Sequence, residues 1–369
     1  MGRIVTFIKK EIVLVVAVVL ALISCFFVVP SEKYLGYIDF KVLGCLFCLM
    51  IVVAGFTSVR ALDVVSIGLL NKAKGVRSIY LILVFITFFS AMIVTNDVAL
   101  ITFVPLAITI LKMSGEEEYV IVTVVMQTIA ANLGGALTPF GNPQNLYLFS
   151  FFNLEVGEFF SITGPIVAFS GVVILLSVFL VKSMSIKVST NTKVEITDKK
   201  RLIVYALMFI LAVLAVFNVV SYVLAVCVTV VAILLVNRRL FLTVDYSLLF
   251  TFVGFFIFVG NMSNIEAVKN FLSSAIAGKE LLSSVLVSQV ISNVPAAILL
   301  SNFTQNYKDL LLGVNIGGLG TLIASLASVI SYKIYCKEEN AKVGKYFGTF
   351  MLYNVIGLLF LLVFAGLLY

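Results

Sequence analysis

The chain has 369 residues, of which 62% are hydrophobic and 12% are charged, and its mean hydropathy is +1.19. These values lie far outside the range of soluble globular domains and predict an all-α polytopic membrane protein. The net charge of +7 comes from basic residues beside apolar spans, where they orient a protein in the bilayer, so we exclude nucleic-acid binding. The chain has no histidine and only scattered cysteines, so we expect no zinc site and no cofactor other than a coupling ion, Na⁺ or H⁺. Any proton coupling must use carboxylates.

The first apolar stretch, residues 11–30, follows three basic residues and shows no convincing cleavage site. We therefore expect a retained first span that starts in the cytoplasm. A second span over residues 37–55 returns inward. Residues 62–70 are too short and too charged a stretch to cross the bilayer, so we expect them to lie on the cytoplasmic surface.

The next apolar region, residues 78–112, is interrupted at Thr95-Asn96-Asp97 and can form either two spans or one re-entrant hairpin. The positive-inside bias favours a hairpin with both ends in the cytoplasm. The spans expected after it cover residues 119–152 (broken), 159–181, 202–219, 221–236, 246–260, 281–302 (re-entrant from outside), 309–332 (broken) and 345–368. This order leaves the amino terminus in the cytoplasm and the carboxyl terminus outside.

Two parts of the chain repeat one another. The stretch 37–43 resembles 243–249, and Asn132–Thr138 matches Asn315–Thr321 at four of seven positions without a gap. Because the first half begins outside and the second inside, we expect an inverted repeat, the arrangement that can exchange inward-open and outward-open states. The prediction is a single membrane transport domain, 1–369, made of an extra amino-terminal span (1–36), repeat 1 (37–182), a cytoplasmic linker with connecting spans (183–242) and repeat 2 (243–369).

Broken apolar segments in matching halves mark the binding site of a secondary transporter. Hydroxyl and amide oxygens at the two breaks are hard donors that suit Na⁺. The predicted Na⁺ ligands are Thr95, Asn96, Asp97, Ser292 and Asn293. The alternative is helix capping, because Ser, Thr, Asp and Asn are also the preferred residues at helix amino termini. Asp97 can be an ion ligand, a proton carrier or a cap.

A glycine pair in each half's broken span, and Pro143 in the first, predict unwound helices. Their amide groups can bind an anion, since no basic residue lies in these motifs. The alternative for the glycines is close helix packing. The candidate substrate- and ion-binding residues are Thr95, Asn96, Asp97, Asn132, Gly134, Thr138, Gly141, Asn142, Pro143, Asn145, Ser292, Asn293, Val294, Asn315, Gly317, Thr321 and Ser325. Gln127 and Gln289 are secondary candidates.

The motifs over residues 94–101, 131–145 and 288–296 resemble those of the ion transporter superfamily, which includes citrate transporter-like permeases, arsenite permeases and divalent anion/sodium symporters. The resemblance covers most of the chain from about Ile38. It implies an inverted-repeat fold with two re-entrant hairpins whose tips help to hold cation and substrate. The sodium-coupled dicarboxylate branch carries Ser-Asn-Thr at both tips, and here Asp97 and Val294 stand in place of the threonines.

The favoured hypothesis is a secondary active transporter of a small anion, such as citrate or another carboxylate, coupled to Na⁺ or H⁺ by alternating access. Arsenite extrusion and Na⁺/H⁺ antiport are the alternatives within the superfamily. No catalytic set is evident in the apolar spans, so we do not expect an enzyme. The expected partners are a small anionic substrate and the lipid bilayer of the cell membrane, and a homodimer stays open.

Overall fold

The structure is a computed structural model that describes residues 11–182 and 194–368. Within these residues the regular elements are all helices, and seven of them are long and apolar enough to cross a membrane, or eight if the bent pair α14–α15 is one span. The prediction of an all-α polytopic membrane protein is therefore confirmed. Several predicted basic orientation signals, namely Arg3, Lys9, Lys10, Lys187 and Lys193, lie outside the described residues.

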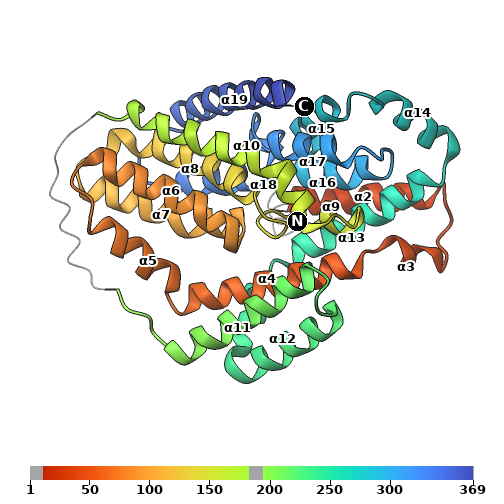
Figure 1. Cartoon of the computed structure of the whole chain (residues 1–369), viewed down its shortest axis with the longest axis horizontal. Helices are drawn as coiled ribbons and strands as arrows, with labels where there is room; N and C mark the ends of the chain where they lie inside the picture. Colours follow the sequence, from red (N-terminus) through yellow and green to blue (C-terminus); the bar gives the residue numbers. More distant parts are fainter. Residues whose placement is uncertain (1–10, 183–193, 369) are drawn as a thin grey trace, which may run out of the picture.

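The helices follow the predicted apolar segments closely (Figure 1). In chain order they are α2 (Ile12–Cys25), α3 (Lys33–Tyr37), α4 (Phe40–Ser58), α5 (Ala61–Leu70), α6 (Val76–Val94), α7 (Asn96–Met113), α8 (Val120–Gly135), α9 (Pro143–Phe151), α10 (Val156–Leu176), α11 (Lys199–Val216), α12 (Tyr222–Asn237), α13 (Tyr246–Ser263), α14 (Glu266–Ile276), α15 (Glu280–Ile291), α16 (Asn293–Ser301), α17 (Tyr307–Ile316), α18 (Leu326–Tyr335) and α19 (Val343–Leu368). Short 3-10 helices lie at Glu117–Tyr119, Ser177–Leu180 (η2), Arg238–Thr243 and Leu322–Ala324.

The first helix is shorter than the expected span over residues 11–30. It ends at Cys25, and the chain cannot resume the helix at Pro30, which disfavours helical backbone at the residue before it and has no backbone donor. Tyr34 then ties the turn, since its hydroxyl donates to the Val28 carbonyl at 2.5 Å. The following α3 is a single short helix before α4.

An outer group of helices is formed by α2 against α13, and by α11 and α12 against α4 (Figure 1). A glycine makes room for a tyrosine ring in two places, between α4 and α11 and between α13 and α3. A Cβ at Gly55 would lie 2.8 Å from the Tyr205 ring, and a Cβ at Gly260 would collide with Tyr37. The outer helices of both halves thus use a glycine to allow close packing of a tyrosine ring.

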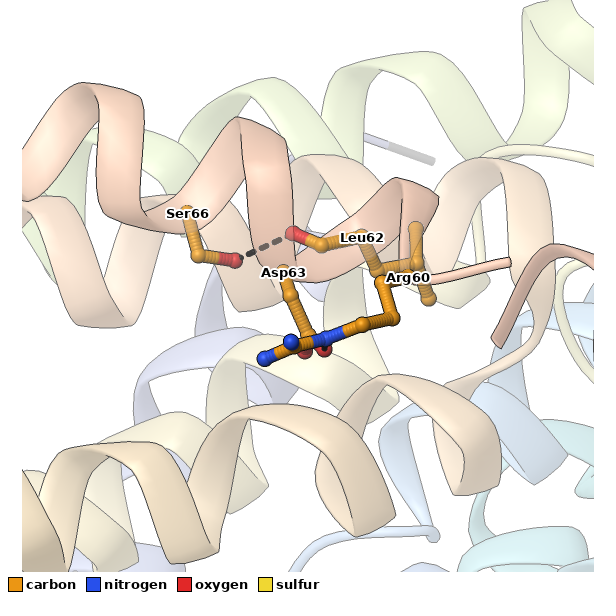
Figure 2. Close-up of polar contacts among 4 residues, drawn as sticks. All are labelled: Arg60, Leu62, Asp63 and Ser66. Atoms are coloured by element: carbon orange, nitrogen blue, oxygen red, sulfur yellow. Dashed lines mark hydrogen bonds and ion pairs between the residues drawn. The ribbon is translucent and has the colours of Figure 1, made fainter. Parts of the chain in front are cut away.

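The helix α5 is the predicted surface segment, and it begins after Arg60, which has a left-handed φ of 60°. Figure 2 shows its local contacts: Arg60 Nε lies 3.2 Å from Asp63 Oδ2, and the Ser66 hydroxyl donates to the Leu62 carbonyl at 2.6 Å. With only ten residues it is about 15 Å long, about half the hydrocarbon thickness.

The inner group contains two helix pairs that break at one residue each, α6–α7 at Thr95 and α15–α16 at Ser292. The second pair has helices of 12 and 9 residues, so neither reaches across a hydrocarbon core of about 30 Å. In the first pair each helix has 18 or 19 residues, and its re-entrant character stays a prediction.

The inner helices of the two halves interlock. The second helix of each hairpin packs on the other half's broken span, α7 on α18 and α16 on α9. In the same way α8 contacts α18, and α17 contacts α9. Residues 136–142 and 317–325, where the broken spans unwind, therefore come together in the middle of the inner group.

Candidate functional site

The two hairpin tips have the same unusual backbone. Thr95 has φ 78° and ψ 148°, and Ser292 has φ 77° and ψ 153°. This region is nearly exclusive to glycine and costs a residue with a Cβ of order 1–3 kcal/mol, and such strained residues cluster at functional sites. Two strained residues at corresponding tips are therefore evidence for a site rather than for ordinary turns.

Capping does not explain the polar residues at the tips. Neither Thr95 nor Ser292 makes a side-chain cap bond to its helix. The Asp97 carboxylate accepts no hydrogen bond within the described part of the chain, whereas Asp39 and Asp245 each cap a helix by accepting the amide three residues on, at 2.9 and 3.0 Å. Asp97 is half-buried at the start of α7, and an ionised carboxylate inside an apolar span is costly unless a cation or a proton balances its charge.

Asn132, on α8 of the first half, collects bonds from both halves. Its Oδ1 accepts from Asn96 Nδ2 at 3.2 Å and from the Ser325 hydroxyl at 2.9 Å. Its own amide nitrogen donates to the Gly318 carbonyl at 3.4 Å. One residue therefore links its own hairpin tip to the unwound segment of the second half.

Asn315, the counterpart of Asn132 in the second half, forms the reciprocal connection. Its Oδ1 accepts from Asn142 Nδ2 at 3.4 Å and from Gln144 Nε2 at 3.3 Å, and its Nδ2 donates to Asn145 Oδ1 at 2.7 Å. Ser325 and Asn142 hold equivalent positions, 10 residues after Asn315 and Asn132 respectively. The two halves thus exchange equivalent side-chain bonds at their junction.

Two threonines tie the unwound segments to the hairpins in matching ways. The Thr138 hydroxyl donates to the Met92 carbonyl at 2.7 Å, and the Thr321 hydroxyl donates to the Gln289 carbonyl at 3.1 Å. Each acceptor lies three residues before its strained tip residue. The tip and the unwound segment are therefore held as one unit in each half.

The predicted glycines divide into two kinds. A Cβ at Gly134 would strike the Phe88 backbone on α6, and one at Gly317 would lie 2.9 Å from Ser288 on α15, so both permit close helix packing. Gly141 lies nearer the junction, where its carbonyl accepts the Asn96 amide at 3.1 Å. Packing, the alternative considered for the glycines, accounts for the first two.

The remaining predicted residues lie at the same junction. Pro143 is the first residue of α9, where its missing donor costs nothing. Ser292 donates weakly to the Ala324 carbonyl at 3.4 Å, and the Asn293 amide nitrogen would be 2.9 Å from a Cβ at Gly318. Val294 is buried beside them and contributes no polar atom.

The site offers oxygen atoms but no basic side chain. Among the buried side-chain oxygens that have no hydrogen-bond partner within the described residues, Asn142 Oδ1 and Gln144 Oε1 belong to side chains of this junction. No lysine or arginine in the described part of the chain is fully buried. An anion bound here must therefore be balanced by helix amino termini or by a bound cation, for which amide and hydroxyl oxygens are suitable ligands.

Some contributing residues were not predicted or were ranked second. Gln144 was not singled out, and Gln289, a secondary candidate, ties the second unwound segment by donating to the Gly317 and Leu319 carbonyls at 2.9 and 3.0 Å. Asn145 does the same in the first half, donating to three carbonyls at 3.2 Å. The sequence signal at Gln144 is an amide beside an apolar stretch, and its burial is what the structure adds.

The apolar spans and the junction of interlocked broken helices define a multi-pass membrane transporter. The sequence matches the citrate transporter family over residues 4–308. It is 33% identical over 318 residues to an uncharacterized transporter of Methanocaldococcus jannaschii, covering 86% of each chain, and 28% identical to the inner membrane protein YbiR of Escherichia coli, covering 85% of this chain and 84% of that one. The chain belongs to the citrate transporter family, which confirms the resemblance drawn from its motifs.

Proposed function

We propose that this protein is a secondary active transporter of a small anion, citrate or another carboxylate, driven by Na⁺ or H⁺. The observation that carries the proposal is the junction of the two halves, where Asn132 and Asn315 exchange bonds with the opposite half and buried oxygens remain unpaired. Because no basic side chain is buried there, a co-bound cation supplies the counter-charge of the carboxylate in this proposal, in addition to the helix amino termini. Coupling then follows from charge neutrality in the site.

Alternating access in this proposal is a movement of the inner helices against the outer ones. The two groups meet mainly where α4 contacts α9, where α13 contacts α16 and through α5 and α6. The reciprocal asparagine bonds join the two halves at the middle of the inner group, which leaves its two ends able to open in turn. The antiparallel relation of the two halves provides two states of similar free energy.

The test is uptake of radiolabelled citrate into proteoliposomes with an imposed Na⁺ gradient, an imposed pH gradient, both or neither. We expect uptake only with one of the gradients, and we expect Asn315→Ala to abolish it. A thermal-shift screen with citrate, dicarboxylates and arsenite, each with and without Na⁺, identifies the ligand because binding to the folded state raises the unfolding temperature. Stabilisation by no carboxylate under any condition would refute the proposal.

Na⁺/H⁺ antiport is the second candidate. It is favoured by the half-buried carboxylate of Asp97, which accepts no hydrogen bond within the described residues. A pH-sensitive dye inside the same vesicles distinguishes the two functions. An antiporter alkalinises or acidifies the lumen when Na⁺ alone is added, whereas a symporter requires the anion.

A further inference from the structure

An apolar groove lies between α10 and α19 on the outside of the inner group, away from the site described above. It has a volume of about 190 Å³, and its lining includes Met126, Leu133, Val173 and Phe360. Both flanking helices are mostly exposed, with 33% of the α10 span window and 17% of the α19 window buried, so they face lipid. A dry apolar cavity of about 150 Å³ is known to take up benzene, so the natural occupant of this one is hydrocarbon.

The two ends of the groove differ. At one end Phe169 of α10 stacks on Phe364 of α19, with ring centroids 4.1 Å apart, which closes the groove. At the other end Ser177 and Leu180 of η2 line it, and Leu180 is 42% exposed. An acyl chain that lies along the groove therefore has its headgroup at the η2 end.

Two basic residues, Arg77 and Lys182, lie at the open end. Arg77 lies over the Phe179 ring at 5.7 Å and donates from Nε to the Val181 carbonyl at 2.7 Å, which fixes the guanidinium beside η2. Lys182 is exposed two residues beyond Leu180. The predicted topology puts this end at the cytoplasmic leaflet, where anionic lipids attract juxtamembrane basic residues.

We propose that the groove between α10 and α19 holds one acyl chain of an anionic phospholipid whose headgroup lies against Arg77 and Lys182. The chain then packs on Leu133, the neighbour of Asn132 in α8. Lipid occupancy thus supports the helix that carries the central asparagine. This proposal does not depend on the identity of the transported substrate.

Native mass spectrometry of the detergent-purified chain tests the proposal, with phosphatidylglycerol and phosphatidylcholine carrying identical acyl chains. We expect one retained phosphatidylglycerol and weaker retention of phosphatidylcholine. Lys182→Gln and Arg77→Gln each weaken phosphatidylglycerol retention by about fivefold, as expected for one basic residue near an anionic surface. Unchanged preference in both variants would overturn the headgroup assignment.

Val173→Trp fills the groove, and Val172→Trp is its matched control because Val172 is 55% exposed on the neighbouring face of α10. We expect the first to abolish retention of both lipids and the second to leave it intact. Equal retention in the two variants would overturn the chain assignment.

A photoreactive acyl chain on phosphatidylglycerol gives a measurement on the wild-type chain that does not depend on how these variants fold. Met126 and Leu133 are 5% and 3% exposed, so bulk lipid cannot label them. Crosslinks at either residue support the groove site. Crosslinks confined to exposed positions such as Val172 would refute it.

Discussion

The two hairpin tips share one backbone and differ in their side chains. Thr95 and Ser292 have φ and ψ values within about 5° of one another, and both precede an asparagine. The first tip continues with a carboxylate, Asp97, whereas the second continues with the buried Val294. The strained turn is therefore common to both halves, and the charge belongs to one.

The same contrast holds in the supports behind the tips. The first unwound segment is held by Asn145 from its own broken span, and the second by Gln289 from its hairpin. Both amides donate to loop carbonyls and leave the segment in the same relation to its tip. A repeated backbone can thus be kept by different side chains, while the side chains that differ in charge set what each half binds.

We expect the largest loss of uptake from substituting Asn132 and Asn315, the equivalent asparagines that link the two halves. Asn132→Ala and Asn315→Ala each leave several buried partners unsatisfied, and one such group costs about 1–3 kcal/mol. We expect uptake in proteoliposomes to fall at least about tenfold in both variants. Asn354→Ala is the control, because this equally buried asparagine bonds only within α19, to the Phe350 carbonyl. Loss of uptake in the control but not at the junction would contradict the assignment.

We expect a smaller effect on transport from removing the charge of Asp97, which is present at the first tip only. Asp97→Asn keeps the size of the side chain and removes its anionic form, so we expect the Na⁺ concentration for half-maximal uptake to rise by about tenfold, or the pH dependence of uptake to flatten if H⁺ is the coupling ion. Val294→Asn is the control at the mirror position. Cation dependence that moves equally in both variants would show that the tips do not differ in charge function.

Measuring the free energy of unfolding together with uptake distinguishes the role of the strained backbone at Thr95 and Ser292 from the role of their hydroxyl groups. Thr95→Gly and Ser292→Gly relieve a conformation that suits glycine, so we expect each to raise the free energy of unfolding by about 1 kcal/mol while uptake falls. Thr95→Ala removes the hydroxyl but keeps the strain, so it should lower uptake without raising the melting temperature. A stabilising alanine variant would assign the effect to the hydroxyl instead.

Much of this arrangement could be predicted from the sequence. Long apolar runs fix the helices, and Thr95 and Ser292 were identified as breaks because polar residues interrupt those runs. Asn132, Asn142, Asn315 and Ser325 were predicted as site residues, and the structure brings them within hydrogen-bond distance. The crossing of these bonds between halves, and the pairing of α2 with α13, depend on tertiary packing that no local pattern encodes. Gln144 was missed because amide side chains at a helix start are common and only burial distinguishes this one.

The smallest effect is expected at two polar links that join the halves at opposite ends of the inner group. Lys112 Nζ lies 2.5 Å from Glu338 Oε2, and the Tyr307 hydroxyl donates to Glu158 Oε1 at 2.5 Å. Both links join the base of one hairpin or broken span to the other half, so each favours closure of its own side. Because partly exposed pairs contribute little, Lys112→Gln and Glu158→Gln should change the ratio of inward-facing to outward-facing protein by only about twofold, in opposite senses.

Labelling of a single cysteine at Ser292, in a cysteine-free background, by a membrane-impermeant reagent from each side measures that ratio. Arg60→Gln is the control, because the Arg60–Asp63 pair lies at the start of α5 and does not link the two halves of the protein. A shift in the same sense for both test variants would mean that the two links do not oppose one another. The charge difference between the tips would then be the only asymmetry that biases the transport cycle, and the Asp97→Asn variant would have to account for the direction of transport by itself.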